Sequence, residues 1–248
     1  TRFISFEGGY HGDTVGAMSV GSSSPWWQTF KTLMFATDIV PFPATFDEDP
    51  NVATHEAQAL DCLAELLQKN SHSYAGIFIE PLVQGAAGMR LCRPQFLQEL
   101  AKLARTHGVL LIYDEVMTGF GRTGELFACL KSSTCPDILC LSKGLSGGCL
   151  PLSVTVATEE IYQAFYSDDI DRAFFHSHSF MGNPLACATG NASLELLTQN
   201  PAAFAGMEAL HRRYMETWLS GHPKIERTRI CGTIAALDLK AESESYLN

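Results

Sequence analysis

Basic residues are scarce in this chain. Its 248 residues include 17 lysines and arginines against 27 aspartates and glutamates, a formal net charge of −10. No run of lysine or arginine stands out, which argues against nucleic acid or an anionic membrane surface as a partner. No apolar stretch is long enough to cross a bilayer. The composition, 46% hydrophobic and 18% charged, is instead that of a globular domain with a sizeable core.

Paired cysteine motifs are also missing. The eight cysteines form no C-x-x-C pair and have no histidine at close zinc-ligand spacing. This pattern predicts free thiols in a reducing compartment rather than a disulfide framework or a metal site. We therefore expect a cytoplasmic protein, and the cysteine pattern leaves an organelle open.

Strand-like and helix-like segments alternate along the chain. Continuous apolar runs predict strands at 2–6, 74–81, 109–116, 137–141 and 152–158. Helical periodicity and end signals predict helices at 53–70, 93–108, 159–167, 183–200 and 201–221, the fourth capped by Asn183. Such alternation predicts an α/β fold with a mostly parallel sheet covered by helices on both faces.

Polar side chains follow the predicted strands where each strand ends. Tyr10 comes after the first strand, Glu80 after the second, Asp114 and Glu115 at the third, and Lys143 after the fourth. The carboxyl ends of parallel strands meet at one edge of the sheet, and ligands bind there. The sequence therefore places an aromatic ring, three carboxylates and a lysine at one candidate site.

A literal G-x-G-x-x-G, formed by Gly119, Gly121 and Gly124, suggests a nicotinamide-dependent dehydrogenase as an alternative. A dinucleotide fingerprint requires a strand, the glycines, a helix and then an acid after the next strand. Here the acids precede the glycines, and the next strand begins at Asp137, too soon for a crossover helix. A glycine-rich surface turn fits better. We favour a third interpretation, a turn that lets the chain leave a strand whose last residue faces a cofactor.

A lysine and an acid at neighbouring strand ends suit an aldehyde cofactor. A lysine amine in a cleft can form a Schiff base with pyridoxal phosphate. A nearby carboxylate keeps the pyridine nitrogen protonated, because an opposite charge raises the pKa of that nitrogen. Lys143, Asp114 and the ring of Tyr10 supply these parts.

Five motifs resemble those of the class III, pyridoxal-phosphate-dependent aminotransferases, across nearly the whole chain. They are "GYHGDT", "IEPLVQGAAGM", "LLIYDEVMTGFGRTG", "FACLKSSTCPDILCLSKGLSGG" and "FMGNPLACATGNASLELL". The resemblance implies the large domain of a fold-type I transferase, with a mostly parallel sheet of the seven-stranded type. It also implies pyridoxal 5'-phosphate as cofactor and transamination of small-molecule substrates as the reaction.

Within the class, "VQGAAGM", "FACLKSSTCPDILCL" and Met117 resemble one subfamily. Its members transfer an amino group from S-adenosylmethionine to 8-amino-7-oxononanoate in biotin synthesis. An omega-amino acid, ornithine or lysine aminotransferase is the alternative within the class.

The resemblance also implies roles for single residues. Lys143 matches the Schiff-base lysine, and Asp114 matches the partner of the pyridine nitrogen. Tyr10 matches the aromatic that stacks on the cofactor and borders the substrate, and Glu80 a carboxylate near the cofactor edge. Val116 matches the residue packed on the second face of the ring.

Glu115, which follows Asp114, and His11, which follows Tyr10, carry expectations of their own. Glu115 matches a residue that supports the hydrogen bonds of the site rather than one that touches the cofactor. His11 is open between a turn histidine and a ligand contact.

The run His176–Ser179 departs from the family pattern. Ser179 matches a hydroxyl that reaches the phosphate of the partner subunit's cofactor, which implies a homodimer with composite sites. Ser177 stands where the family has a glycine that approaches the substrate closely, and His178 adds a group that can titrate there.

The chain also resembles only part of such an enzyme. We expect residues 1–225 to form most of the large cofactor-binding domain and 226–248 to begin a small C-terminal domain. The family's Gly-Ser phosphate cup is expected upstream of Thr1, and its carboxylate-binding arginine beyond Asn248.

Overall fold

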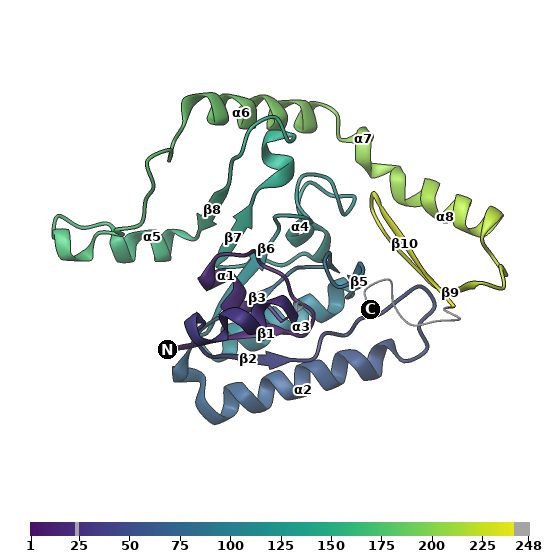
Figure 1. The fold of residues 1–248 in the computed structure, drawn as a ribbon, viewed down its shortest axis with the longest axis horizontal. Helices are drawn as coiled ribbons and strands as arrows, with labels where there is room; N and C mark the ends of the chain where they lie inside the picture. The colour runs from purple at the N-terminus through teal and green to yellow at the C-terminus, as the bar shows by residue number, and fades with distance from the viewer. Residues whose placement is uncertain (23–24, 241–248) are drawn as a thin grey trace.

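A six-stranded sheet forms the centre of the computed structural model, which describes residues 1–22 and 25–240 (Figure 1). Its strands lie in the order β2-β1-β3-β6-β7-β8. They are β1 (Arg2–Phe6), β2 (Thr37–Val40), β3 (Tyr74–Ile79), β6 (Leu110–Asp114), β7 (Ile138–Leu141) and β8 (Val154–Ala157). The first five in this order are parallel, and β8 pairs with β7 antiparallel. The predicted mostly parallel sheet is confirmed, with six strands in the described residues rather than seven.

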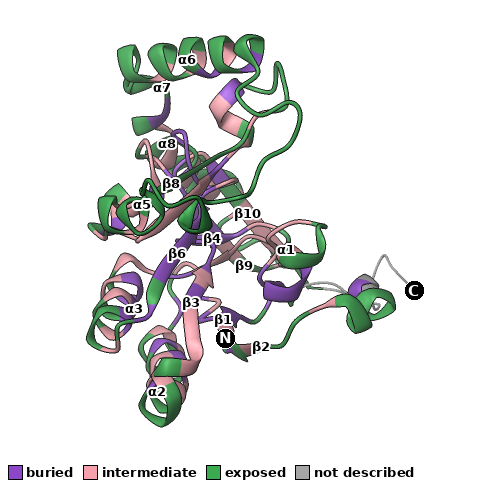
Figure 2. Ribbon diagram, turned by 90° about the vertical axis from the view of Figure 1, so that its left-hand side faces the viewer, coloured by how far each residue is buried: buried purple, intermediate pink, exposed green. Residues whose placement is uncertain are grey.

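Helices cover the sheet on both faces. Helices α2 (Val52–Asn70) and α3 (Pro94–Thr106) lie on one face, and α1 (Val15–Val20) lies on the other (Figure 2). The apolar stripe of α2 includes Leu63 and Leu67, both almost completely buried. In α3, Leu97 and Leu100 are buried in the same way. Each such side chain stabilises the fold by about 1.5–3 kcal/mol through burial, so the apolar stripes hold α2 and α3 on the sheet.

The remaining elements lie around this centre. They are the helices α4 (Ala128–Ser132), α5 (Glu159–Phe165), α6 (Pro184–Gln199), α7 (Ala202–Ala205) and α8 (Met207–Trp218), the 3-10 turns η1 (Pro25–Leu33), η2 (Ser71–Ser73), η3 (Lys143–Ser146) and η4 (Ile170–Arg172), and two hairpins, β4 (Val83–Gln84) with β5 (Arg90–Leu91) and β9 (Ile225–Cys231) with β10 (Ile234–Leu239). None of the helices in the part of the chain described is both long and apolar enough to cross a membrane.

Two expectations about helix ends have different outcomes. Asn183 caps α6 as predicted, because its side chain accepts hydrogen bonds from the N–H groups of Leu185 and Ala186. The single helix predicted for 201–221 is wrong. It divides at Gly206 into α7 and α8, and Phe204 of α7 is buried against the turn at Gly121. Glycine is a weak helix former, and the helical pattern is interrupted at Gly206.

The antiparallel direction of β8 follows from its connection. Between β7 and β8 the chain forms the short turn η3 and no crossover helix. Parallel neighbours need a longer crossover, usually helical. The chain therefore returns antiparallel at this edge of the sheet.

Candidate active site

The strand order reverses at one point of the sheet. The chain passes from β1 to β2 on one side and then returns to β3 on the other side of β1. In open α/β sheets, ligands bind at the carboxyl ends of strands beside such a reversal. Tyr10 and His11 follow β1, Glu80 follows β3, Asp114 ends β6 and Lys143 follows β7. The predicted strand-end residues therefore share one edge of the sheet.

Asp114 is a buried carboxylate with both oxygens held. His11 Nδ1 lies 2.8 Å from Oδ2, and the Val116 N–H donates to Oδ1 at 3.0 Å. The side chains of His11 and Asp114 are only 4% and 10% exposed, so bulk water does not screen the pair. The sequence leaves His11 open between a turn histidine and a ligand contact. In the structure its ring contacts the side chain of Asp114. Nothing in the sequence pairs these residues, which lie 103 positions apart.

Glu80 joins two loops at the same edge. Its carboxylate accepts hydrogen bonds from the Tyr10 N–H at 3.0 Å and the Gly85 N–H at 2.9 Å. Burial raises the pKa of Glu80, and these two donors and His11 partly offset the rise. Glu80 thus fixes the backbone on either side of the site.

The ring of Tyr10 lies parallel to that of Trp27, with centroids 6.1 Å apart and planes at 19°. Its hydroxyl donates to Asp13 at 3.0 Å. Trp27 comes from η1 and was not identified from the sequence, because no motif marks it. The stacking role of Tyr10 toward a cofactor stays a prediction.

Lys143 begins η3 directly after β7 and is exposed. The register pairs Asp114 with Cys140, three residues before the lysine, and the Glu115 N–H donates to the Cys140 carbonyl at 2.9 Å. The backbone of Lys143 has φ of 40°, in the left-handed region. Such a conformation costs on the order of 1–3 kcal/mol in a residue with a side chain, so its surroundings must impose it.

The residue after Lys143 shows what imposes this backbone. A Cβ on Gly144 would lie 2.7 Å from the Cβ of Phe120, in the glycine-rich turn. On the other side, Ser193 of α6 donates to the Gly144 carbonyl at 3.0 Å. The turn and α6 together hold the lysine at the strand end.

Glu115 points away from this edge and is fully buried. Its carboxylate accepts hydrogen bonds from the N–H groups of Ala128 at 2.6 Å and Cys129 at 2.8 Å. These donors are at the start of α4, which has no side-chain cap of its own. Burial raises the pKa of Glu115, and the two donors partly offset the rise. Glu115 therefore supports the site through α4.

Two of the three sequence signals of the subfamily, "VQGAAGM" and Met117, lie together. A Cβ on Gly85 would lie 2.9 Å from the sulfur of Met117. Gly85 belongs to "VQGAAGM" and also donates to Glu80. A larger residue than glycine would therefore displace Met117. Val116 is half-buried, and the position of its side chain against a cofactor ring stays a prediction.

Ser177 and Ser179 lie elsewhere. Both are exposed in the segment between η4 and α6, and Ser179 begins the turn that leads to Asn183. Among the residues described, no hydrogen bond or ion pair joins either serine to Lys143, Asp114 or Tyr10. The chain alone does not bring them to the strand-end cluster.

The glycine turn is not a simple surface turn, which was the less favoured of the two turn interpretations. Gly119 and Gly121 are buried. A Cβ on Gly121 would meet the ring of Phe204 at 2.7 Å, and one on Gly124 would lie 3.3 Å from the Cα of Gly232. The glycines allow close approach of other segments of the same chain.

These residues fit pyridoxal phosphate. Asp114 offers a buried negative charge, fixed on both oxygens, to a protonated ring nitrogen. Lys143 offers a primary amine from the neighbouring strand end. Reversible attachment of an aldehyde needs an amine, and a protonated pyridine needs a carboxylate.

Comparison with known proteins agrees with a pyridoxal phosphate site at Asp114 and Lys143. The family model for aminotransferase class-III matches residues 1–247. The chain belongs to the class III aminotransferase family.

Relatives within this family share sequence and fold with the chain. It is 50% identical over 248 residues to a Synechococcus elongatus protein named adenosylmethionine-8-amino-7-oxononanoate aminotransferase. The crystal structure of a protein of the same name from Methanocaldococcus jannaschii is 34% identical and has a TM-score of 0.84 over 96% of this chain. An amine transaminase from an uncultivated Pseudomonas species, in its pyridoxal-phosphate-bound form, is 29% identical with a TM-score of 0.87 over 96% of this chain.

The relatives are longer than this chain. The chain covers 58% of the Synechococcus protein, 53% of the Methanocaldococcus structure and 55% of the Pseudomonas structure. The similarity therefore concerns roughly half of each relative.

Proposed function

We propose that the protein containing this chain is a pyridoxal-phosphate-dependent aminotransferase. We propose S-adenosylmethionine as its amino donor and 8-amino-7-oxononanoate as its acceptor, in the formation of the diamine precursor of biotin. The observation that carries the reaction type is the buried Asp114–His11 pair beside Lys143 at the neighbouring strand end. The substrates are proposed from the names of the relatives at up to 50% identity.

Asp114 and Lys143 would hold the cofactor at its two reactive ends. The Asp114 carboxylate keeps a proton on the ring nitrogen, and His11 and the Val116 N–H keep that carboxylate in place. The Lys143 amine binds the aldehyde carbon. Tyr10 and Val116 would border the two faces of the ring, and Glu80 its edge. Pyridoxal phosphate, when bound, supplies an aldehyde that accepts amines and a ring that withdraws electrons.

Lys143 would have a second role as a base. When it does not hold the cofactor, its amine would take up and return the proton at the α-carbon of the substrate. This role requires a neutral amine at a fixed position, and η3 with its strained backbone gives that position.

We also propose that the enzyme is a homodimer in which Ser179 of each subunit, with Ser177 near the substrate, completes the other subunit's site. The segment from the end of α5 to the start of α6 is exposed (Figure 2), and its large apolar side chains support the proposal. They include Tyr166, Ile170, Phe174, Phe175, Phe180 and Leu185, each at least 66% exposed. Contiguous exposed apolar surface of this kind marks an interface. Residues 1–225 would form the large domain and 226–248 the start of the small one.

Borohydride trapping tests the cofactor bond. The full-length protein is incubated with pyridoxal phosphate, reduced, digested and mapped by mass spectrometry. We expect the reduced cofactor on Lys143, because it is the lysine beside Asp114 at the strand ends. A Lys143→Ala variant is the control and should show no label. Label on a different lysine of the wild-type protein would contradict the assignment.

The substrate assignment needs a separate measurement. The reduced, pyridoxamine form of the enzyme absorbs differently from the aldehyde form, so half-reactions can be followed without a product assay. S-adenosylmethionine should convert the cofactor faster than ornithine or an omega-amino acid does. The opposite order would place the protein elsewhere in the class.

A further inference from the structure

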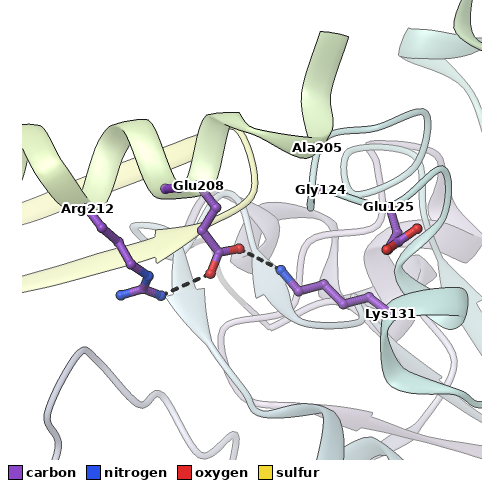
Figure 3. A pocket seen from close by; sticks show the side chains of 7 residues that line it. Gly124, Glu125, Lys131, Ala205, Glu208 and Arg212 are labelled. Atoms are coloured by element: carbon purple, nitrogen blue, oxygen red, sulfur yellow. Dashed lines mark hydrogen bonds and ion pairs between the residues drawn. The ribbon is translucent and has the colours of Figure 1, made fainter. Parts of the chain in front are cut away.

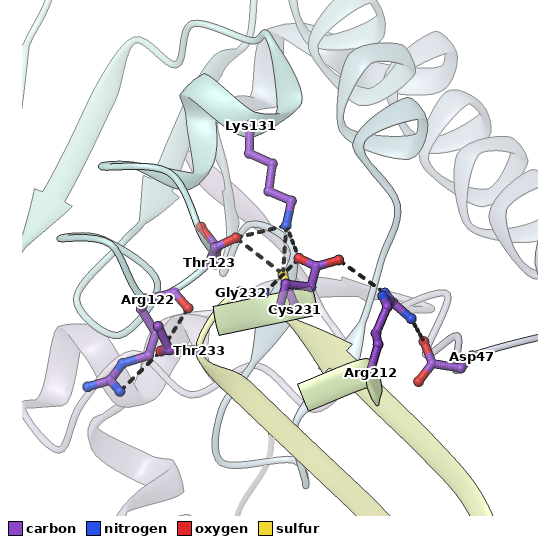
Figure 4. Close-up of polar contacts among 9 residues, drawn as sticks. Asp47, Arg122, Thr123, Lys131, Arg212, Cys231, Gly232 and Thr233 are labelled. Atoms are coloured by element: carbon purple, nitrogen blue, oxygen red, sulfur yellow. Dashed lines mark hydrogen bonds and ion pairs between the residues drawn. The ribbon is translucent and has the colours of Figure 1, made fainter. Parts of the chain in front are cut away.

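The tip of the β9–β10 hairpin lies on the glycine turn 119–124. Gly232, at the tip, has φ of 59°, and a Cβ there would lie 2.1 Å from the carbonyl carbon of Thr123. The next residue, Thr233, donates its N–H to the Arg122 carbonyl at 2.9 Å (Figure 4). Backbone therefore meets backbone, with no room for a side chain between them.

Glu208 of α8 is the centre of an ion-pair junction beside this contact. Its carboxylate accepts hydrogen bonds from Lys131 Nζ at 2.7 Å and from Arg212 at 3.1 Å (Figure 3). It also accepts one from the Gly232 N–H at 2.9 Å. Burial acts to raise the pKa of Glu208, but the three donors outweigh it and lower the pKa to about 2. The carboxylate is therefore charged at neutral pH and bound on three sides.

The junction joins two parts of the chain. Lys131 of α4 also donates to the Thr123 carbonyl at 2.8 Å, within the glycine turn, and lies 3.8 Å from the sulfur of Cys231 (Figure 4). Arg212 of α8 pairs with Asp47 at 3.2 Å. Lys131 and Asp47 come from the part of the chain that carries the central sheet. Glu208 and Arg212 come from α8, which directly precedes the hairpin.

Two cavities border the junction. One, of about 380 Å³, lies at Gly124, Lys131 and Glu208 (Figure 3). The second, of about 390 Å³, includes Lys131, Glu208 and Arg212 in its wall. Cys231 and Ile234 of the hairpin belong to the hydrophobic core, so the polar contacts of the junction and this apolar packing together keep the hairpin docked.

We propose that Glu208 is a positioning residue that latches the β9–β10 hairpin onto the glycine turn. The turn continues directly from β6 and Asp114, so the latch sets the place of the hairpin relative to the strand-end site. The glycines that resemble a dinucleotide motif serve this docking. Resting on the proposed function, the latch should govern substrate binding rather than the chemical step, because Glu208 contacts none of the strand-end residues.

Amide hydrogen exchange in the full-length protein tests the latch without a cofactor. Glu208→Gln keeps the shape of the side chain and removes its charge. We expect exchange in the peptides covering 225–239 and 119–124 to rise by about ten-fold or more, as for loss of a charged hydrogen bond. Exchange in β3 and β6 should stay at the wild-type rate. Glu216→Gln, at an exposed glutamate of the same helix, is the matched control and should change neither region.

A double-mutant cycle distinguishes the latch from general stabilisation. Lys131→Met should also raise exchange in the same peptides. The rise in the double variant should be smaller than the product of the two single effects, because both changes remove the Lys131–Glu208 ion pair. Glu208→Asp retains the charge and should restore part of the protection. Wild-type exchange in Glu208→Gln, or an equal rise throughout the core, would refute the latch.

Steady-state kinetics test the functional part. In Glu208→Gln we expect KM for the amino substrates to rise by about three- to ten-fold with kcat nearly unchanged, as for a loss of uniform binding. An unchanged KM, or a lower kcat alone, would refute the positioning role. If the wild-type protein has no transaminase activity, the proposed function fails, and hydrogen exchange still decides whether the hairpin is latched.

Discussion

The carboxylate of Asp114 shows how single residues divide the work of this site. His11 and the Val116 N–H occupy one position on each of its oxygens, and each oxygen keeps a lone pair for a ligand. Glu115, the next residue, faces the other way and caps α4. Successive side chains in an extended chain point to opposite sides. Asp114 therefore faces the candidate site, and Glu115 holds the start of α4 that supports it.

Replacing Asp114 with Asn tests the charge without changing the shape. The ring nitrogen should then lose its proton more readily, because a neighbouring carboxylate shifts such a pKa by roughly one to three units. We expect turnover to fall on the order of a hundred-fold, since each pKa unit corresponds to about 1.4 kcal/mol. Single-turnover kinetics of the full-length enzyme measure this loss. Turnover within a few-fold of the wild type would mean that the ring nitrogen lies elsewhere.

At the scale of elements, the turn 119–124 has three neighbours. It contacts Phe204 of α7 at Gly121, η3 through Phe120, and the hairpin tip at Gly232. These contacts need backbone without side chains at the touching points, which explains why glycine recurs there. The turn therefore organises both Lys143 and the C-terminal hairpin.

The contact with Phe204 can be tested by a matched pair of variants. Gly121 and Gly88 have the same φ of 86°, but a Cβ would meet Phe204 at 2.7 Å at Gly121 and no atom within 4 Å at Gly88. Alanine should therefore cost the same backbone strain at both sites, plus about 1–3 kcal/mol of overpacking at Gly121 alone. Urea unfolding of both variants gives the difference. Equal midpoints would show that α7 does not pack on the turn in solution.

At the scale of the whole molecule, the segment from α5 to α6 extends away from the body (Figure 1). Its aromatic residues are mostly exposed, and those on either side of Ser179 include Phe175 and Phe180 at 79% and 77% exposure. Water contact at such rings is unfavourable. A second subunit that covers them would also bring Ser179 to a site, which the single chain does not do.

Mixed dimers test the composite site. One subunit carries Lys143→Ala and the other Ser179→Ala. If Ser179 acts across the interface, both changes affect one site, and the other site has an intact lysine and an intact hydroxyl. That site should bind pyridoxal phosphate with wild-type retention, measured by absorbance after dialysis. If Ser179 acts within its own chain, the lysine-bearing site should lose cofactor as readily as the Ser179→Ala homodimer does.

The sequence by itself determined five of the six strands of the sheet, all except β2, and the order of polar residues at its edge. Strand and helix periodicities are local patterns, so β3, β6 and α3 lie close to their predicted ranges. Parallel strands align their carboxyl ends, so the positions of Glu80, Asp114 and Lys143 at that edge followed from the chain order.

Only the tertiary structure decided which side chains meet. His11 and Asp114 are 103 residues apart, Lys131 and Glu208 are 77 apart, and Gly232 reaches the turn from more than a hundred residues away. The burial of Phe204 against Gly121 likewise depends on a contact between distant parts of the chain. Local hydrophobic patterns carry no information on such pairings, because they depend on how whole elements pack in three dimensions.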